Sequence, residues 1–186
     1  MRVTQIKAYV LQAPDDGRPH WVSHFVVPRA NELLVRLATD EGVSGFGLAT
    51  CYSTVEPVIS AFKSGIADEI VGADPLAPER LYERLFALTS QRKAYESGWS
   101  RDALIKITAA VDIACWDIVG KALGQPIYNL LGGQVHERLR SYTYLYPAPE
   151  SEVQDTLSVA DAFGDAVVGP ERAAHYVAQG FTAVKF

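Results

Sequence analysis

The segment from residue 108 to residue 133 constrains the fold of this chain more than any other part of the sequence. Its apolar residues recur at steps of three and four positions, which is the spacing of one buried face of a helix. Ser100 is a suitable N-cap, and Gly124 followed by Pro126 is a typical stop signal. The sequence therefore predicts a core helix from about Ser100 to Gly124 with one nearly buried face. The residues of that face are Ile107, Ala110, Val111, Ala114 and Ile118.

The order of residue types in this helix is more specific than its periodicity. It reads AVDxACWDxxGK over residues 110–121, then PI at 126–127 and LLG at 130–132. This order closely resembles the signature of the mandelate racemase and muconate lactonizing enzyme group in the enolase superfamily. It departs at Ile107, where a small residue is usual, and at Cys115. The resemblance implies an amino-terminal α+β capping domain that is joined to a modified α/β barrel.

Composition excludes several classes of partner. The chain has 186 residues, 48% of them hydrophobic, and a net charge of -5 without a basic cluster, which argues against nucleic acid or an anionic membrane surface. Cys51 and Cys115 form no metal-type pair and suggest no disulfide framework. The sequence has no apolar run long enough to span a bilayer and no signal peptide at its start, so we expect a cytoplasmic protein.

The first part of the chain has the pattern of antiparallel strands. Residues 3–11 alternate between apolar and polar side chains, and residues 25–27 and 32–39 form two further candidate strands. Asp40-Glu41-Gly42 predicts a tight reversal into a strand over residues 43–49. Residues 12–24 are rich in turn formers and predict a mobile loop. The result is a predicted antiparallel meander.

Helices follow the meander. Ser53 and Glu56 have the spacing of a reciprocal capping box, which predicts a helix that runs to about Lys63. A second helix is predicted over residues 78–88, and residues 91–98 read as a polar connection to the core helix. Strands followed by helices favour an α+β domain.

The pattern changes after residue 133. A strand, a helix and a second strand are typical of the βαβ unit that is repeated in a parallel α/β barrel. We therefore predict a capping domain over residues 1–133 and the start of a TIM-like (β/α) barrel over residues 134–186. One βαβ unit leaves its strand edges unpaired, so we expect a chain that is part of a longer protein. The predicted elements are a strand at 138–146, a loop at 150–169, a helix at 171–179 and a strand at 181–186.

Lys185 is the candidate catalytic residue. It resembles the first lysine of the Lys-x-Lys motif that mandelate racemase relatives carry on the second barrel strand. In that family the first lysine contacts the substrate carboxylate or tunes the second, which is often the base and would fall at position 187. The alternative is a strand-end lysine that extends into solvent.

The resemblance also implies a cofactor and a substrate-binding region. Relatives hold Mg²⁺ with acidic residues at the ends of later barrel strands, so we assign no metal ligand in this chain. Active sites of such barrels lie at the carboxyl ends of the strands, and loops of the capping domain cover them. The residues predicted to bind substrate are His20, Trp21 and His24 in the first loop, Thr50 and Tyr52 in a second loop, and Tyr144 at the end of the first barrel strand.

The resemblance implies a magnesium-dependent acid-sugar dehydratase, a lyase that removes the proton beside a carboxylate through an enediolate. A divalent cation and positioned donors would stabilise that enediolate. The expected partner is a small-molecule carboxylate, and the expected assembly is a homo-oligomer. Two alternatives stay open: a racemase or cycloisomerase of the same superfamily, and a non-catalytic fragment or assembly module.

Overall fold

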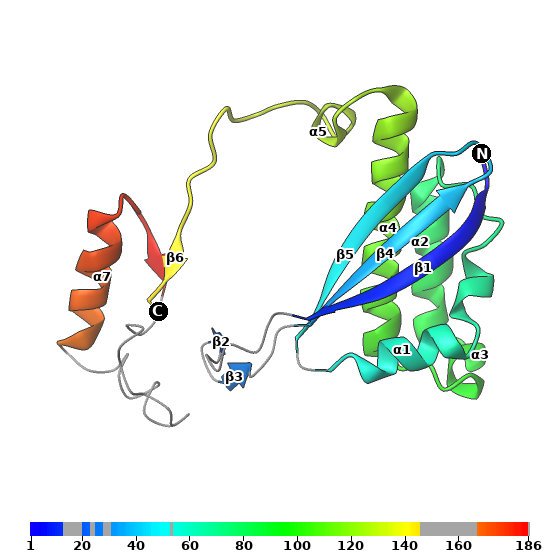
Figure 1. Cartoon of the computed structure of the whole chain (residues 1–186), viewed down its shortest axis with the longest axis horizontal. Helices are drawn as coiled ribbons and strands as arrows, with labels where there is room; N and C mark the ends of the chain where they lie inside the picture. The colour runs from blue at the N-terminus through cyan, green and yellow to red at the C-terminus, as the bar shows by residue number, and fades with distance from the viewer. Residues whose placement is uncertain (13–19, 23–24, 28–30, 53, 146–166, 186) are drawn as a thin grey trace. The chain divides into compact units, whose positions relative to one another are not determined.

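The computed structural model describes residues 1–12, 20–22, 25–27, 31–52, 54–145 and 167–185 (Figure 1). The chain divides into two compact units. The first comprises Met1–Asp16 and Arg29–Gln134, and the second comprises Gly17–Pro28 and Val135–Phe186.

The first unit contains a three-stranded antiparallel sheet in the order β1-β4-β5. Its strands are β1 (Val3–Gln12), β4 (Asn31–Thr39) and β5 (Ser44–Tyr52). Residues alternate between buried and half-buried along the central strand β4, because one sheet face packs on the core. The predicted meander is confirmed for these three strands.

The prediction was wrong for the segments between β1 and β4. Residues 20–22 lie in a strand, β2 (His20–Val22), where a loop was expected. The strand β3 (Phe25–Val27) pairs antiparallel with β2 in a separate two-stranded ladder and not with the meander. The hydrophobic pattern of three-residue strands is too short to specify their partners. The rest of the expected mobile loop, residues 13–19 and 23–24, lies outside the described residues.

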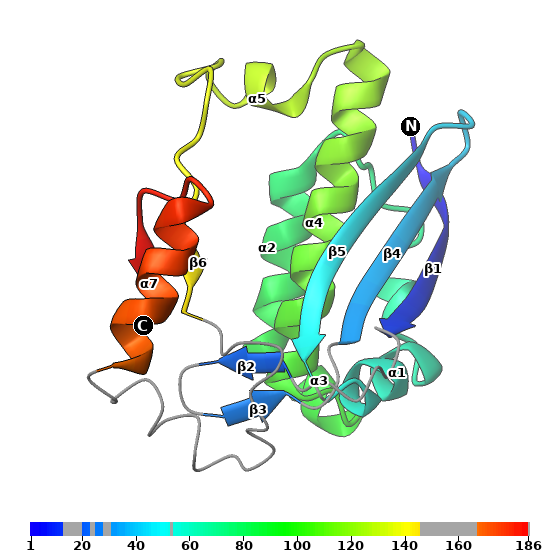
Figure 2. The ribbon, with the colours of Figure 1, turned by 60° about the vertical axis from the view of Figure 1, so that its left-hand side comes forward.

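Helices cover one face of the sheet, and α4 (Arg101–Leu123) runs along β5 and β4 (Figure 2). The predicted capping box was wrong. The N-cap of α1 (Glu56–Lys63) is Val55, no side chain caps this helix, and the Glu56 carboxylate accepts the Val55 N–H at 3.1 Å. A five-residue helix, α3 (Arg92–Glu96), also replaces part of the expected polar connection. The elements are α1 (Glu56–Lys63), η1 (Ile66–Glu69), α2 (Pro78–Ala87), η2 (Leu88–Ser90), α3 (Arg92–Glu96), α4 (Arg101–Leu123) and α5 (Ile127–Leu130).

The core helix α4 confirms the prediction at both ends. The Ser100 hydroxyl accepts the N–H of Ala103 at 3.1 Å, and Gly124 adopts the left-handed conformation that ends the helix. Ala110, Ala114 and Ile118 are each 0% exposed, as the apolar stripe predicts. They belong to one hydrophobic core that the sheet and the helices share.

Two glycines of β5 allow this strand to lie directly against α4. A Cβ at Gly47 would meet the carbonyl oxygen of Ala110 at 1.8 Å, and a Cβ at Gly45 would meet that of Ala114 at 2.1 Å. Asp117 fixes the same contact, because its carboxylate accepts the Phe46 N–H at 2.9 Å. Small residues on both elements and one carboxylate therefore set the distance between helix and sheet.

The second unit contains a strand, a helix and a strand in the predicted order. Its strands β6 (Thr143–Tyr144) and β7 (Val184–Lys185) pair in parallel, and α7 (Val168–Ala178) lies between them in sequence. The strands are shorter than the predicted 138–146 and 181–186, and the helix begins three residues earlier than predicted. The predicted loop over residues 150–169 lies almost entirely outside the described residues.

No helix in the described part of the chain combines the length and the apolar character that crossing a membrane requires.

Candidate functional site

Tyr144 and Lys185 lie side by side on the parallel strands of the second unit. They are directly paired in the register of β6 and β7, and the Leu145 N–H donates to the Lys185 carbonyl at 2.9 Å. Because successive side chains alternate across a strand, both side chains lie on one face of this pair. The Lys185 ammonium donates to the Tyr144 hydroxyl at 3.1 Å and lies 4.9 Å from the centre of its ring. Two residues that are 41 positions apart in sequence thus form one polar group.

This contact changes the ionisation of both partners. The hydrogen bond from Lys185, reinforced by its charge, lowers the pKa of Tyr144 below its ordinary value. The same hydrogen bond raises the pKa of Lys185. Lys185 is therefore an ammonium at neutral pH, which suits contact with an anionic group and does not suit a general base.

Tyr142, which directly precedes β6, extends this group. Its ring centre lies 6.1 Å from that of Tyr144 at an interplanar angle of 52°, and its hydrogen bond to Tyr144 contributes to the lowered Tyr144 pKa. Tyr142 was not among the residues predicted from the sequence. The alternation of Tyr142 and Tyr144 with Thr143 is the signal that could have found it, since residues two apart on a strand share a face.

The other predicted substrate-binding residues lie on other elements of the chain. Thr50 is exposed near the end of β5 in the first unit, where its hydroxyl donates to the Glu32 carboxylate at 3.2 Å. Tyr52 is the last residue of that strand, so the prediction that Thr50 and Tyr52 lie in a second loop was wrong. His20 and Trp21 lie on β2, opposite residues 27 and 26. His24 lies outside the described residues.

In the described ranges, no three His, Cys, Asp or Glu side chains converge to a geometry that could hold a metal ion. We assign no metal ligand from these residues. Asp117, an acidic residue of the core-helix motif, is instead engaged with the Phe46 N–H and with Lys121, whose ammonium lies 2.6 Å from the carboxylate. Its role in this structure is to join α4 to β5.

An antiparallel meander with helices on one face is the architecture of the capping domain in the enolase superfamily, and the parallel β/α unit that follows is the start of its barrel. Residues 5–132 match the family described as mandelate racemase / muconate lactonizing enzyme, N-terminal domain. The chain belongs to this family.

Relatives with assigned names include two kinds of enzyme. A D-galactonate dehydratase from Ralstonia nicotianae is 32% identical over 147 residues, which cover 78% of this chain and 31% of the relative. An N-succinyl-L-Arg/Lys racemase from Bacillus cereus is 29% identical over 190 residues, which cover 100% of this chain and 44% of the relative. The chain thus spans less than half the length of these curated relatives.

Two solved structures illustrate the similarity, and each aligns with the full length of this chain. A mandelate racemase/muconate lactonizing enzyme-like protein from Roseovarius sp. TM1035 has a TM-score of 0.71 and 30% identity, and the alignment covers 100% of this chain and 42% of that chain. A mandelate racemase/muconate lactonizing enzyme from Sulfitobacter sp. has a TM-score of 0.70 and 30% identity, with the same coverage of 100% and 42%.

Proposed function

We propose that the whole protein is an acid-sugar dehydratase, a lyase that removes the proton beside the carboxylate and eliminates the neighbouring hydroxyl. The observation that carries this proposal is the alignment of 147 residues, at 32% identity, with a D-galactonate dehydratase. We also propose that residues 1–133 form the capping domain and residues 134–186 form the start of the barrel. The substrate would be a small-molecule carboxylate, and the assembly a homo-oligomer.

Within this proposal Lys185 binds the substrate carboxylate. Its raised pKa keeps it positively charged, and charge-assisted hydrogen bonds to a carboxylate are among the stronger ones in proteins. Tyr144 holds the ammonium in place through their 3.1 Å hydrogen bond. Once the proton leaves, charge builds up on the carboxylate oxygens, so a fixed ammonium beside them stabilises the transition state more than the ground state.

The other predicted substrate-binding residues keep their proposed role in substrate selection. Thr50 and the aromatic and imidazole side chains of Tyr52, His20, Trp21 and His24 supply the hydrogen-bonding groups that a hydroxyl-rich ligand requires.

The proposal includes Mg²⁺ as the cofactor of the whole protein. A bound dication would neutralise charge on the enediolate. No ligand is assigned to it among the described residues, and the roles of Lys185 and Tyr144 do not depend on it.

A racemase is the second candidate. It is favoured by the N-succinyl-L-Arg/Lys racemase, whose alignment covers the complete chain and therefore includes the segment of Tyr144 and Lys185. Racemisation begins with the same proton abstraction and differs in the fate of the enediolate, which is reprotonated and does not lose a hydroxyl group.

A substrate panel separates the two candidates. The whole protein is incubated with Mg²⁺ and either a set of acid sugars or a set of N-acylated amino acids, and the products are identified by NMR. The dehydratase proposal predicts an α-keto-β-deoxy acid from at least one acid sugar. If the protein inverts the configuration of an N-acylated amino acid and leaves every acid sugar unchanged, the racemase proposal would replace the dehydratase proposal.

A further inference from the structure

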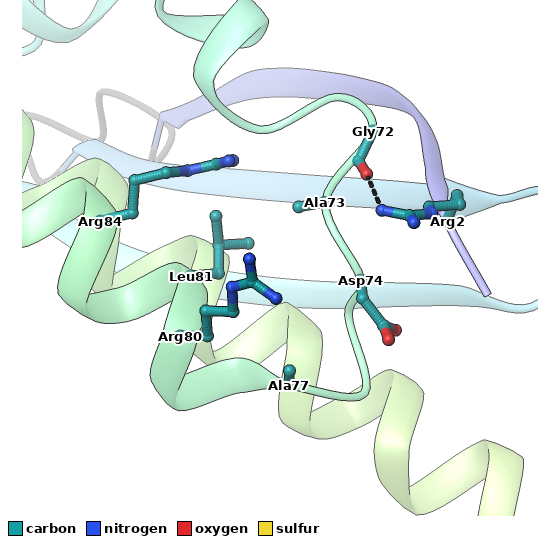
Figure 3. Close-up of a pocket in the computed structure, with 8 residues that line it drawn as sticks. All are labelled: Arg2, Gly72, Ala73, Asp74, Ala77, Arg80, Leu81 and Arg84. Carbon is teal, nitrogen blue, oxygen red and sulfur yellow. Dashed lines mark hydrogen bonds between the residues drawn. The ribbon is translucent and has the colours of Figure 1, made fainter.

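A pocket of about 320 Å³ lies in the first unit, between the start of β1, the loop before α2 and α2 itself (Figure 3). It contains none of the residues proposed above for the reaction or for substrate selection. Its volume is at the lower end of the range of roughly 300 to 1,000 Å³ that is typical of small-molecule sites. The lining residues are Arg2, Gly72, Ala73, Asp74, Ala77, Arg80, Leu81 and Arg84.

The pocket is defined by three arginines. Arg80 and Arg84 extend from successive turns of α2, and Arg2 reaches the loop from the start of β1 (Figure 3). Arg2 donates to the Gly72 carbonyl at 2.9 Å, and Arg84 donates to the backbone carbonyl of Glu69. These acceptors are neutral, so they orient the guanidinium groups without cancelling their charge.

The positive charge of this pocket is incompletely compensated. In the described part of the chain none of the three arginines forms an ion pair. Asp74 is the one acidic residue among the lining residues, which leaves an excess of two positive charges. The chain as a whole has a net charge of -5. A concentrated positive pocket on an acidic protein attracts anions locally, although the average field repels them.

The backbone of the pocket is held in place before any ligand arrives. The Gly72 N–H donates to the Val3 carbonyl at 2.8 Å, and the Val3 N–H donates to the Ala73 carbonyl at 2.9 Å. The Asp74 carboxylate accepts the Leu76 N–H at 3.0 Å, which fixes the turn into α2. Leu81, between the two helix arginines, is only 4% exposed and anchors α2 in the core. Because the backbone is already ordered, less conformational entropy is lost when a ligand binds.

We propose that this pocket binds a small phosphate dianion, either free or as the phosphate group of an ester. Two uncompensated charges match the charge of a phosphate dianion. The planar guanidinium groups can each donate two parallel hydrogen bonds to phosphate oxygens. The arginines are exposed, so the affinity falls as ionic strength rises.

Calorimetric titration of the whole protein tests this proposal. Inorganic phosphate and glycerol phosphate are titrated separately at constant ionic strength. We expect saturable binding to one site per chain, and tighter binding of the ester would identify an ester group as the ligand. Arg80→Gln and Arg84→Gln should each raise the dissociation constant at least about tenfold, the change that corresponds to roughly 1.4 kcal/mol.

Arg101→Gln is the matched control, because Arg101 is also an exposed helix arginine and does not line the pocket. It should leave the dissociation constant unchanged, and the melting temperatures of all three variants should confirm that they are folded. The absence of saturable binding of both ligands would overturn the proposal. The proposal would also be overturned if Arg101→Gln raised the dissociation constant as much as Arg80→Gln or Arg84→Gln, since phosphate would then be attracted by positive charge anywhere on the protein.

Discussion

Gly47 shows how a single residue controls the packing of the capping domain. Gly47 has only a hydrogen atom where other residues have a Cβ. A Cβ at this position would lie 1.8 Å from the Ala110 carbonyl oxygen and would collide with the backbone of α4. The obstacle is backbone and not the flexible end of a side chain, so the contact has little room to adjust. The fit of β5 to α4 therefore depends on glycine at this position.

Gly47→Ala should destabilise the protein by about 3 kcal/mol or more, because overpacking forces the strand away from the helix. The free energy of unfolding, measured by urea denaturation monitored by circular dichroism, tests this expectation. Leu48→Ala is the control, since Leu48 is 45% exposed and points to the opposite face. If Gly47→Ala unfolds at the same urea concentration as the parent protein, the close contact between β5 and α4 does not exist in solution.

The Lys185–Tyr144 contact has a testable effect on ionisation. Lys185→Met should raise the pKa of Tyr144 towards its ordinary value, because the hydrogen bond that lowers it is lost. NMR titration of labelled tyrosine would measure this change. An unchanged Tyr144 pKa would mean that the two side chains do not meet.

The same contact predicts how its contribution to stability depends on pH. The folded-state pKa of Tyr144 is lowered, so its contribution grows as pH rises through that value. The folded-state pKa of Lys185 is raised, so its contribution is complete below the unfolded value and disappears as pH rises through the folded one. The attraction should therefore be strongest in the alkaline interval between these two folded-state pKa values.

Lys185→Ala should lower turnover of the native acid sugar by at least about a hundredfold, the scale of a lost charge-assisted contact in the transition state. The melting temperature should hardly change, because the Lys185 side chain is exposed. Steady-state kinetics of the whole protein and a thermal melt provide both readouts. Near-normal turnover would support the alternative in which Lys185 only extends into solvent.

At the scale of secondary structure, the sequence predicts best where local residues determine an element. Ser100 and Gly124 determine the ends of α4, and both were found from the sequence. The five-residue helix α3 (Arg92–Glu96) was missed because its N-cap is Gln91, which is not a typical capping residue, and its side chain makes no capping bond.

Elements that depend on distant partners were predicted less well. The ends of β6 and β7 are set by the hydrogen bonds that each makes with the other, which the sequence pattern of one strand does not contain. The meander could be predicted from the sequence because the alternation of side chains along the central strand β4 specifies a buried face. For the candidate site, the order strand-helix-strand placed Tyr144 and Lys185 near strand ends, but their direct contact depends on a register that only the structure gives.

Ser100→Ala should destabilise the protein by about 1 kcal/mol, because the N–H of Ala103 loses its capping acceptor. Ser100→Asp keeps an acceptor at the same position and should retain most of the stability. Chemical denaturation of both variants gives the two differences. Equal stability of Ser100→Ala and the parent protein would show that the cap contributes nothing to α4.

At the scale of the whole molecule, the two units have different roles in the proposed function. The first unit has a hydrophobic core that its sheet and helices share and belongs to the mandelate racemase / muconate lactonizing enzyme amino-terminal domain. The second unit carries the parallel pair with Tyr144 and Lys185. The chain spans 31% of the dehydratase relative and 44% of the racemase relative, so the proposed chemistry belongs to the whole protein.

The most direct test of the proposed dehydration is NMR analysis of the reaction of the whole protein with an acid sugar and Mg²⁺ in heavy water. The base takes the proton beside the carboxylate, the neighbouring hydroxyl leaves as water, and the resulting enol takes up a deuteron from the solvent. The expected product is an α-keto-β-deoxy acid with one deuterium at the carbon that lost the hydroxyl group. A product that keeps the hydrogen beside the carboxylate, or no reaction with any acid sugar, would contradict this mechanism.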